Sequence, residues 1–572
     1  MKRREQSQTE QLRQALAERE AQLQEARSRL AALEGSTSLQ VGKALTAAAK
    51  RPGKSLVKLP RDLYRLWRSS GNTRHTERRR RRGGAEPVRS FDAERQESRL
   101  LTGLSGGSED LLVVATVVGP SIAEAIDPYV RPVPLRPHDA QIVMDGVDVD
   151  LVLVSASAAA PGSPWAHVGD PAAADRTRAL HWVLESAASR GIPTVLLDDV
   201  PSPPALRELG FDRVHRGDAG VPLHLFNPVA ADLTPGPETV FVRVHREDPV
   251  PGVLAGLDAG VVEADSRGLA DALRAAKVAV VAPLTAEEPR LHSRAWACGT
   301  RAVTAGEGLA VTVPRMRAEE PTAAEQRGML RQVFLREATP VRLAEILDGL
   351  DFPPGTPGRE LPLRGRSVAV LADPAGEADA DRLADDLLAA ALRPAEVVVP
   401  GTASRLPGIQ RLRAEGVTVR TVRFNAPDTP EELTRDEPGG RAGEPWATLA
   451  ERATAPWSHL WTAPVGRRRL ADLVCAVECT DADAVGTVDA SAAEPGAHGF
   501  LDRPGTADRQ YVFVSAVVPE LVRTTLLRRG WDPAEWNRRG TRLLALGPDH
   551  GTGDDAEDPV SDAADASTGA VG

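Results

Sequence analysis

Three observations in the sequence predict a multi-domain α/β protein. A chain of 572 residues is too long for a single hydrophobic core, and domain sizes suggest roughly three or four folded units. Short, continuous apolar runs alternate with helical patterns, as expected where crossover helices bury parallel strands on both faces. A Pro- and Gly-rich linker at residues 351–366 then separates this series from a second series of strands and helices.

The alternation before the linker is long enough for two Rossmann-like domains. We expect residues 110–245 to form the first and residues 246–350 to form the second. Strands are predicted at 111–119, 150–156, 193–200 and 277–283, with helices at 172–190, 266–276, 322–336 and 340–348.

Residues 367–548 are predicted to form a third α/β domain. It opens on the apolar run SVAVLADP, continues through AEVVVPG and VTVRTVRF, and includes a strand at 510–518. Residues 549–572 are acidic and rich in Gly, Ala and Ser, which predicts a disordered tail.

Residues 1–35 carry the heptad pattern of a short coiled coil. Leu16, Leu23 and Leu30 recur every seven residues among Glu, Gln and Arg, and Gly35 ends the pattern. The pattern indicates either a homodimer through this helix or a solitary charged helix.

Residues 36–109 form a basic amphipathic segment and linker. Within 43–82, Leu residues and Trp67 can share one helical side with Lys and Arg around it, which is typical of a helix on an anionic membrane surface. Each basic residue there contributes about 1 kcal/mol of attraction. The same face could instead dock on the protein's own domains, and the sequence leaves both interpretations open.

Composition narrows the class of protein. The net charge of −10 argues against a nucleic-acid partner, and no apolar run approaches the roughly 20 residues that span a bilayer. Only three cysteines are present, which indicates a reducing compartment, and Cys475 and Cys479 are expected to pack in a core rather than bind zinc. We therefore expect a cytoplasmic protein, and the membrane interpretation of residues 43–82 would place it at the inner face of the plasma membrane.

No strong catalytic or phosphate-binding motif is present, so the functional interpretation rests on resemblance to known families. The stretch RLHSRAWACGTRAVT at 290–304 resembles the second domain of GT-B glycosyltransferases, where a helix ending in a Gly-Thr turn faces the donor diphosphate. The resemblance implies donor-binding roles for Arg290, His292, Arg294, Gly299 and Thr300. Arg294 stands where the family has a ribose-binding Glu, and His292 and Arg294 could equally be ordinary helix-surface residues.

The stretch WVLESAASRGIPTVLLDDVPSP resembles the first domain of spore-maturation-type glycosyltransferases. Asp198 and Asp199 end its strand, where the expected cleft between the two domains would lie, so they are the candidate catalytic acid or base. A polar turn with no catalytic role is the alternative.

The C-terminal domain resembles a family 2-like GT-A nucleotide-sugar domain. Its stretch HLWTAPVGRRRLADLVCAVECTDADAVG matches the strand, metal-binding turn and helix of that family, but the turn at 462–466 has no carboxylate. Asp472, Asp481 and Asp483 follow in the sequence without replacing the turn. We therefore expect a degenerate GT-A-like domain with no metal site and no cofactor.

These resemblances imply a glycosyltransferase-like protein of cell-envelope polysaccharide or teichoic-acid type. It would transfer a hexose-type sugar from a nucleotide-sugar donor, without metal, to a glycan or lipid-linked acceptor. The alternative is a catalytically inactive pseudo-glycosyltransferase that binds glycan or acts as a scaffold, and the missing acids and Arg294 favour it.

Overall fold

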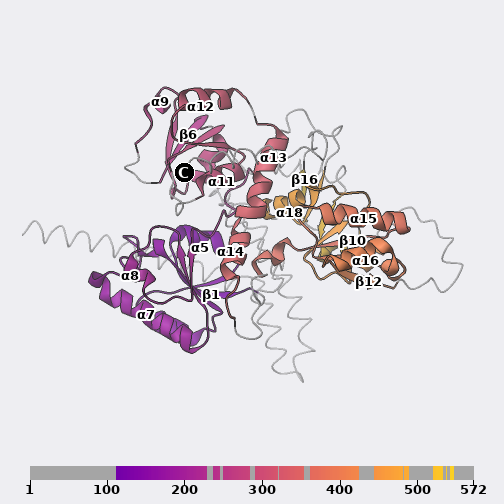
Figure 1. The fold of residues 1–572 in the computed structure, drawn as a ribbon, viewed down its shortest axis with the longest axis horizontal. Helices are drawn as coiled ribbons and strands as arrows, with labels where there is room; N and C mark the ends of the chain where they lie inside the picture. The colour runs from indigo at the N-terminus through magenta and orange to yellow at the C-terminus, as the bar shows by residue number, and fades with distance from the viewer. Residues whose placement is uncertain are drawn as a thin grey trace, which may run out of the picture. The chain divides into compact units, whose positions relative to one another are not determined.

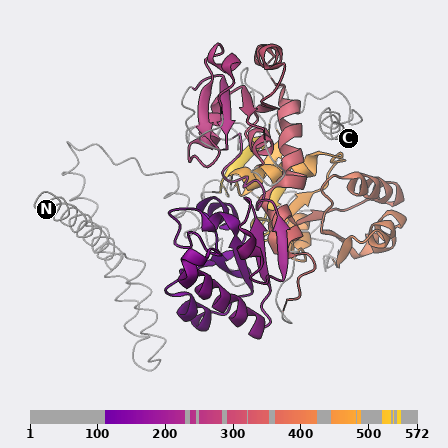
Figure 2. The same ribbon diagram turned by 60° about the vertical axis from the view of Figure 1, so that its left-hand side comes forward.

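The computed structural model shows three parallel or mostly parallel sheets, each flanked by helices (Figures 1 and 2). The structure describes residues 111–228, 236–244, 249–283, 290–319, 321–352, 361–423, 444–480, 482–487, 519–531, 536 and 541–546. The coiled coil predicted at 1–35, the basic segment at 36–109, the strand at 510–518 and the tail at 549–572 lie outside these residues. Among the described residues, no helix has the length and apolar character needed to cross a bilayer.

The first sheet has five parallel strands in the order β2-β1-β3-β4-β5. Its central strands are buried along their whole length, because their Val and Leu side chains meet helices on both faces. The strands are β1 (Val113–Val117), β2 (Arg131–Pro134), β3 (Leu151–Ser155), β4 (Thr194–Asp198) and β5 (Arg213–Arg216). The helices between them are α5 (Pro120–Ile126), α6 (Ala140–Gly146), α7 (Ala174–Ser189) and α8 (Pro204–Arg207), with short 3₁₀ turns η1 (Ala156–Ala159) and η2 (Pro171–Ala173).

The second sheet has four parallel strands in the order β7-β6-β8-β9. Its strands are β6 (Thr239–Arg243), β7 (Gly260–Glu263), β8 (Val278–Val281) and β9 (Arg301–Thr304). Its helices are α9 (Gly252–Ala255), α10 (Leu269–Ala275), α11 (Leu291–Ala297), α12 (Leu309–Ala318) and α13 (Ala323–Gln332). The domain boundary expected at residue 245 is wrong, because β6 pairs with β7 and β8 and its Val240 and Val242 lie in their core.

The chain then returns to the first sheet. The π-turn η3 (Val333–Glu337) leads into α14 (Thr339–Leu347), whose Leu343, Ile346 and Leu347 share a core with Leu112 and Leu153. The helix expected to finish the second domain therefore covers the first. The end of the expected linker is also folded, since η4 (Leu361–Arg366) buries Leu361 and Arg366.

The third sheet has seven strands in the order β12-β11-β10-β13-β15-β14-β16, and β15 is antiparallel to both of its neighbours. The strands are β10 (Val368–Leu371), β11 (Glu396–Pro400), β12 (Thr418–Val422), β13 (Trp457–Leu460), β14 (Ala484–Thr487), β15 (Leu521–Arg523) and β16 (Leu543–Leu546). The helices are α15 (Glu377–Ala389), α16 (Pro407–Ala414), α17 (Glu444–Ala450), α18 (Arg469–Thr480) and α20 (Thr524–Leu527), with the 3₁₀ turn η5 (Gly401–Arg405).

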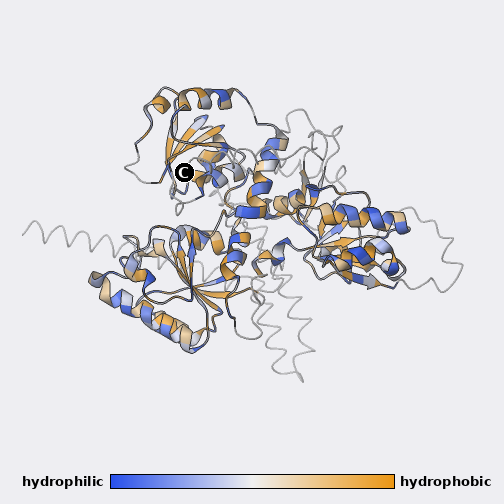
Figure 3. Ribbon diagram, viewed as in Figure 1, coloured by the Kyte–Doolittle hydropathy of each residue, from blue (hydrophilic) through white to orange (hydrophobic). Residues whose placement is uncertain are grey.

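Gly408 allows α16 to approach α15 closely. A Cβ atom at this position would lie 2.0 Å from the carbonyl oxygen of Ala380, so only a glycine fits. Strands and inward helix faces are apolar in all three units, whereas the outward faces of α7, α15 and α16 are largely hydrophilic (Figure 3).

Helix α18 is buried on nearly all sides, and this explains its apolar sequence. Its Leu473, Val474 and Cys475 belong to one continuous core that also contains residues of the second sheet and of α11. The cysteines are all buried, Cys298 directly after α11 and Cys475 and Cys479 on α18, which confirms the core packing expected for the latter two. The second and third units thus share apolar packing through α18.

Candidate functional site

The carboxyl edge of the first sheet brings polar groups together at the ends of β1 and β3, the neighbouring strands between which the strand order reverses. In open parallel sheets, ligands bind outside the carboxyl ends of the strands at such a point. Here the Gly119 N–H donates to Ser155 Oγ at 3.0 Å, and Ser155 Oγ lies 2.9 Å from Ser157 Oγ. A Cβ atom on Gly119 would be 2.6 Å from Ser157 Oγ, so glycine is what lets this turn reach the serines.

Asp199 lies at the same edge, directly after β4. It is buried, and its Oδ1 accepts a hydrogen bond from the Ser157 N–H at 3.1 Å. Burial raises the pKa of the Asp199 carboxyl above its ordinary value, although hydrogen bonds from Ser157 oppose the shift; the charge of Asp218 adds to it. A carboxylate with a raised pKa is a stronger base, as general acid–base catalysis requires.

Asp198 has a different environment from Asp199, as expected for consecutive residues at the end of a strand. Its side chain is only 1% exposed and forms an ion pair with Arg207 of α8. Asp198 therefore ties α8 to the sheet, and the structure does not bring it together with Ser157 or Asp199.

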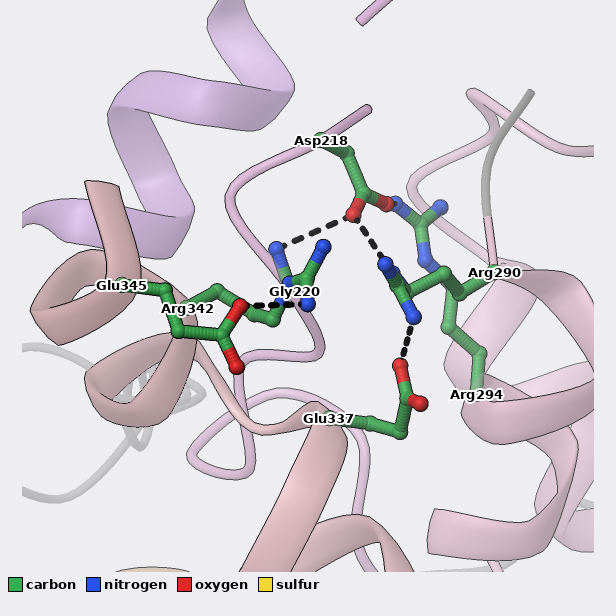
Figure 4. Close-up of polar contacts among 7 residues, drawn as sticks. All are labelled: Asp218, Gly220, Arg290, Arg294, Glu337, Arg342 and Glu345. Atoms are coloured by element: carbon green, nitrogen blue, oxygen red, sulfur yellow. Dashed lines mark hydrogen bonds and ion pairs between the residues drawn. The ribbon is translucent and has the colours of Figure 1, made fainter. Parts of the chain in front are cut away.

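A cluster of charged side chains surrounds Asp218, in the loop after β5 (Figure 4). We call it the Asp218 cluster: Asp218, Arg290, Arg294, Glu337 and Arg342. Asp218 Oδ1 lies 3.2 Å from Arg290 Nε, and its Oδ2 lies 3.9 Å from Arg294 Nη2. Arg290 also pairs with Glu337. The cluster thus joins residues from the first unit, from α11 and from the η3–α14 segment.

Two glycines shape the loop that carries Asp218. Gly217 and Gly220 have φ values of 102° and 88°, in the left-handed region that favours glycine. The Gly220 N–H donates to Asp218 Oδ1 at 3.1 Å. A Cβ atom at Gly220 would lie 2.7 Å from the Glu337 carbonyl oxygen and 2.6 Å from Arg342 Cγ. The loop can therefore reach Arg290 and Glu337 only because position 220 has no side chain.

The hydrogen bonding of the cluster is incomplete within the described part of the chain. Arg294 is buried over the Phe226 ring, 5.2 Å from its centroid, and its side chain donates a long hydrogen bond of 3.4 Å to the Ala264 carbonyl. Burial lowers the pKa of Arg294, opposed by Asp218. The Nε atoms of Arg294 and Arg342 and the Oδ2 atom of Asp218 accept or donate no hydrogen bond among the described residues. Buried charged groups with spare hydrogen-bonding capacity are unusual in proteins and are typical of sites that take a ligand.

His215, on β5, reports the electrostatic potential beside the cluster. Burial, together with the charges of Arg342, Arg213 and Arg290, lowers its pKa to about 4, and the charge of Asp218 opposes this shift. The guanidinium groups therefore outweigh the carboxylate at this point, and His215 is neutral near pH 7.

The five predicted donor-binding residues divide into two groups. Arg290 and Arg294 belong to the Asp218 cluster. His292 instead lies 3.1 Å from Thr304 Oγ1 through Nε2 and packs edge-on against Trp296, and burial lowers its pKa.

Gly299 and Thr300 serve the local fold. Gly299 has a φ of 81°, which the turn after α11 requires. Thr300 is buried, and its hydroxyl donates to the Leu273 carbonyl at 2.5 Å. That hydroxyl is already used within the protein, which leaves Arg290 and Arg294 as the predicted donor-binding side chains with access to a shared site.

In the turn after β13 of the third sheet, hydrogen-bond donors are bound by a carboxylate of the protein itself. Asp386 of α15 accepts hydrogen bonds from Trp461 Nε1 at 2.9 Å, from the Val465 N–H at 2.7 Å and from the Gly466 N–H at 2.8 Å. A carboxylate of the protein thus binds the donors of the turn at which the resemblance would place metal ligands.

The nearby acids are also engaged. Asp472 pairs with Arg331, and Asp483 pairs with Arg523 at 2.9 Å, whereas Asp481 lies outside the described residues. Across the ranges that the structure describes, no three His, Cys, Asp or Glu side chains are grouped so as to hold a metal ion.

Sequence reasoning missed Asp218, Glu337, Arg342 and Asp386. A weak signal for Asp218 exists, because Gly217-Asp218-Ala219-Gly220 follows a strand and precedes a buried segment. Glu337, Arg342 and Asp386 lie on helical segments, where a charged residue ordinarily indicates a solvated face.

The chain matches no protein-family model and no curated protein sequence. The geometry above is therefore the basis on which a function can be proposed.

Proposed function

We propose that residues 111–352 form a glycosyltransferase that uses a nucleotide-sugar donor without a bound metal. The acceptor would be a glycan or a lipid-linked carrier, as in the cell-envelope polysaccharide and teichoic-acid enzymes that the sequence resembles. The third unit would then be a GT-A-like domain that has no catalytic turn.

The proposed reaction is a displacement at the anomeric carbon of the donor sugar. The acceptor hydroxyl oxygen bonds to that carbon as the bond from the carbon to the diphosphate oxygen breaks. Asp199 takes the hydroxyl proton, and the nucleoside diphosphate leaves with the electron pair of the broken bond. Arg290 and Arg294 would stabilise the charge on the leaving diphosphate, because guanidinium groups bind phosphate oxygens with two parallel hydrogen bonds.

One observation carries this proposal. A carboxylate with a raised pKa, Asp199, lies close enough to Asp218 to be affected by its charge, and Asp218 contacts the half-buried Arg290 and the buried Arg294, whose Nε has no hydrogen-bond partner among the described residues. A base and an anion-stabilising group at one sheet edge are the pair that glycosyl transfer requires.

A second candidate function is a pseudo-glycosyltransferase that binds glycan or acts as a scaffold. The pairing of Arg290 with both Asp218 and Glu337 favours it, since these carboxylates already neutralise the charge that a diphosphate would need. Asp386 in the third unit favours it in the same way.

Thermal-shift and calorimetric titration with UDP-, GDP- and CDP-sugars separates the two functions. The enzyme requires saturable binding of at least one nucleotide sugar, and Arg294→Ala should abolish that binding. Arg178→Ala is the matched control, because Arg178 is an exposed arginine of α7 that pairs with the exposed Asp175 three positions earlier.

Two outcomes would contradict the enzymatic proposal. Binding of free glycan with no response to any nucleotide would favour the scaffold. Nucleotide binding that is unchanged in Arg294→Ala would place the donor somewhere other than the Asp218 cluster.

A further inference from the structure

We propose that the third α/β unit supports the Asp218 cluster, with α18 fixing the π-turn η3 and η3 fixing Glu337, Arg290 and the Asp218 loop. Arg366 and Glu478 are then positioning residues for a site to which they contribute no contact. This goes beyond the proposed function, because it holds whichever ligand the cluster binds.

The first link joins α18 to the helix before η3. Arg331 of α13 and Asp472 of α18 form a two-pronged ion pair, with Nε to Oδ1 at 2.8 Å and Nη2 to Oδ2 at 3.3 Å. Both side chains are 5% exposed, so water screens the pair weakly. The pair lies inside the apolar core that α18 shares with the second unit.

The second link reaches η3 itself. Glu478 of α18 accepts from Arg366 Nε at 2.7 Å and Nη2 at 3.0 Å, and from the Tyr129 hydroxyl at 2.9 Å. Arg366 Nη1 donates to the Phe334 carbonyl at 2.6 Å, and its guanidinium lies 3.9 Å above the centroid of the Phe334 ring. A single guanidinium therefore joins α18 to the backbone of the π-turn.

The third link joins the other end of η3 to the cluster. The Glu337 carboxylate pairs with Arg290, and its carbonyl accepts from the Val221 N–H at 2.8 Å. The Thr339 N–H donates to the Val221 carbonyl at 3.0 Å, so residues 337–339 hold the segment directly after the Asp218 loop. Gly220 also packs closely against the Glu337 carbonyl, since a Cβ atom at position 220 would lie 2.7 Å from its oxygen.

The π-turn makes the connection short. Phe334 and Glu337 are three positions apart in one turn, which is closed by a 2.8 Å hydrogen bond from the Ala338 N–H to the Val333 carbonyl. π-turns are rare and frequently lie at functional sites. A displacement of Phe334 therefore moves Glu337 with it, and Glu337 positions both Arg290 and Val221.

Hydrogen exchange of the full-length protein tests this proposal without any ligand. Glu478→Gln removes the charge that holds Arg366 while keeping the size of the side chain. We expect amides in residues 333–342 and 215–222 to exchange roughly ten-fold faster or more, because the opening free energy of these segments falls together. Asp385→Asn is the matched control, since it breaks an exposed ion pair with Arg411 in the same unit and should leave both segments unchanged.

Two further variants keep the test decisive. Tyr129→Phe removes only the hydroxyl bond to Glu478 and should give a smaller increase in the same two segments, which decides the question if Glu478→Gln does not fold. Arg366→Lys keeps a positive charge beside Glu478. Amides in residues 333–342 should therefore exchange more slowly in this variant than in Glu478→Gln.

Faster exchange confined to α18 and η4, with residues 215–222 protected as in the natural chain, would overturn the proposal. The nucleotide titration is a separate measurement. A chain that binds no nucleotide but shows coupled exchange would contradict the proposed function and leave this inference standing.

Discussion

The first and third sheets each carry a turn after a parallel strand where polar groups gather, and the two turns differ in what satisfies those groups. At the first sheet, Asp199 is buried with a raised pKa, and the adjoining Asp218 cluster has donors without partners among the described residues. At the third sheet, Asp386 accepts three hydrogen bonds from Trp461, Val465 and Gly466. One turn has unused binding capacity, and the other is satisfied from within the chain.

This difference shows that the fold of a unit alone does not determine whether it has a ligand-binding site. Both sheets are open and mostly parallel, so both have the edge at which ligands commonly bind. What distinguishes them is the balance of donors, acceptors and charge at that edge. The following predictions test that balance, beginning with the largest expected effect.

Replacing Asp199 with Asn should lower the rate of sugar transfer by about 10²–10⁴-fold, because the amide cannot take the proton of the acceptor hydroxyl. Binding of the nucleotide donor should be unchanged, and the two are measured by initial rates and by calorimetry. Asp175→Asn, at an exposed position of α7, is the control. Equal rates of sugar transfer for Asp199→Asn and the natural chain would show that Asp199 is not the catalytic base.

Replacing Arg331 with Ala should destabilise the protein by about 3–5 kcal/mol, because the buried Asp472 then loses its two-pronged ion pair with Arg331. Urea denaturation measures the change. The double variant Arg331→Met with Asp472→Leu should recover most of the stability, since apolar side chains can replace a buried ion pair. A small loss in the single variant would mean that α18 is held to α13 by apolar packing alone.

Lowering the pH should weaken the third unit through His459 of β13. Burial lowers the pKa of His459 to about 4, against about 6.5 in an unfolded chain. The unfolded state therefore binds a proton first, and stability is lost as the pH falls from about 6.5 to 4, on the order of 3 kcal/mol in all.

The control for this pH dependence is His459→Gln, which should flatten the loss measured by urea denaturation between pH 7 and pH 4. An unchanged profile in His459→Gln would assign the acid sensitivity to other groups. His215 beside the Asp218 cluster has the same direction of shift, so His215→Gln separates the contributions of the two regions.

Replacing Asp386 with Ala should have the smallest effect, a loss of about 1–3 kcal/mol, because donors of Val465, Gly466 and Trp461 lose their acceptor. Thermal unfolding measures the loss, and Asp385→Ala one position earlier is the exposed control. Asp386→Ala should also bind no Mn²⁺, since no carboxylate replaces the one removed. Manganese-dependent stabilisation of this variant would show that the turn keeps other ligands.

The sequence predicts most of the buried strands and the edge strand β12, but it misses β6 inside the second sheet and β2 at the edge of the first. β1, β3, β4 and β8 coincide with continuous apolar runs. β2 contains Pro132 and Pro134 and is partly exposed, so its sequence shows no such run. The boundary expected at 245 is wrong because no local pattern assigns β6 to a sheet, and only its pairing with β7 and β8 shows that it belongs to the second.

The candidate site is predictable only in part for the same reason. Asp199 could be found because its position follows directly from a strand end. The glycines around Asp218 give only a weak signal, and its partners Arg290 and Arg294 could not be predicted, because they are more than seventy positions away and no local pattern contains them. The role of Asp386 depends likewise on a turn that is distant in the sequence.

The rate at which the buried cysteines are alkylated would measure how often the structure around them opens. Only a thiolate reacts readily with alkylating agents, and burial raises the pKa of Cys298 to about 12 and that of Cys475 well above its ordinary value. Modification must therefore wait for the surrounding structure to open. Labelling of Cys298 reports the opening of the second unit, and labelling of Cys475 reports the opening around α18 in the third unit. Equal labelling rates for the two thiols would indicate that the two units open together.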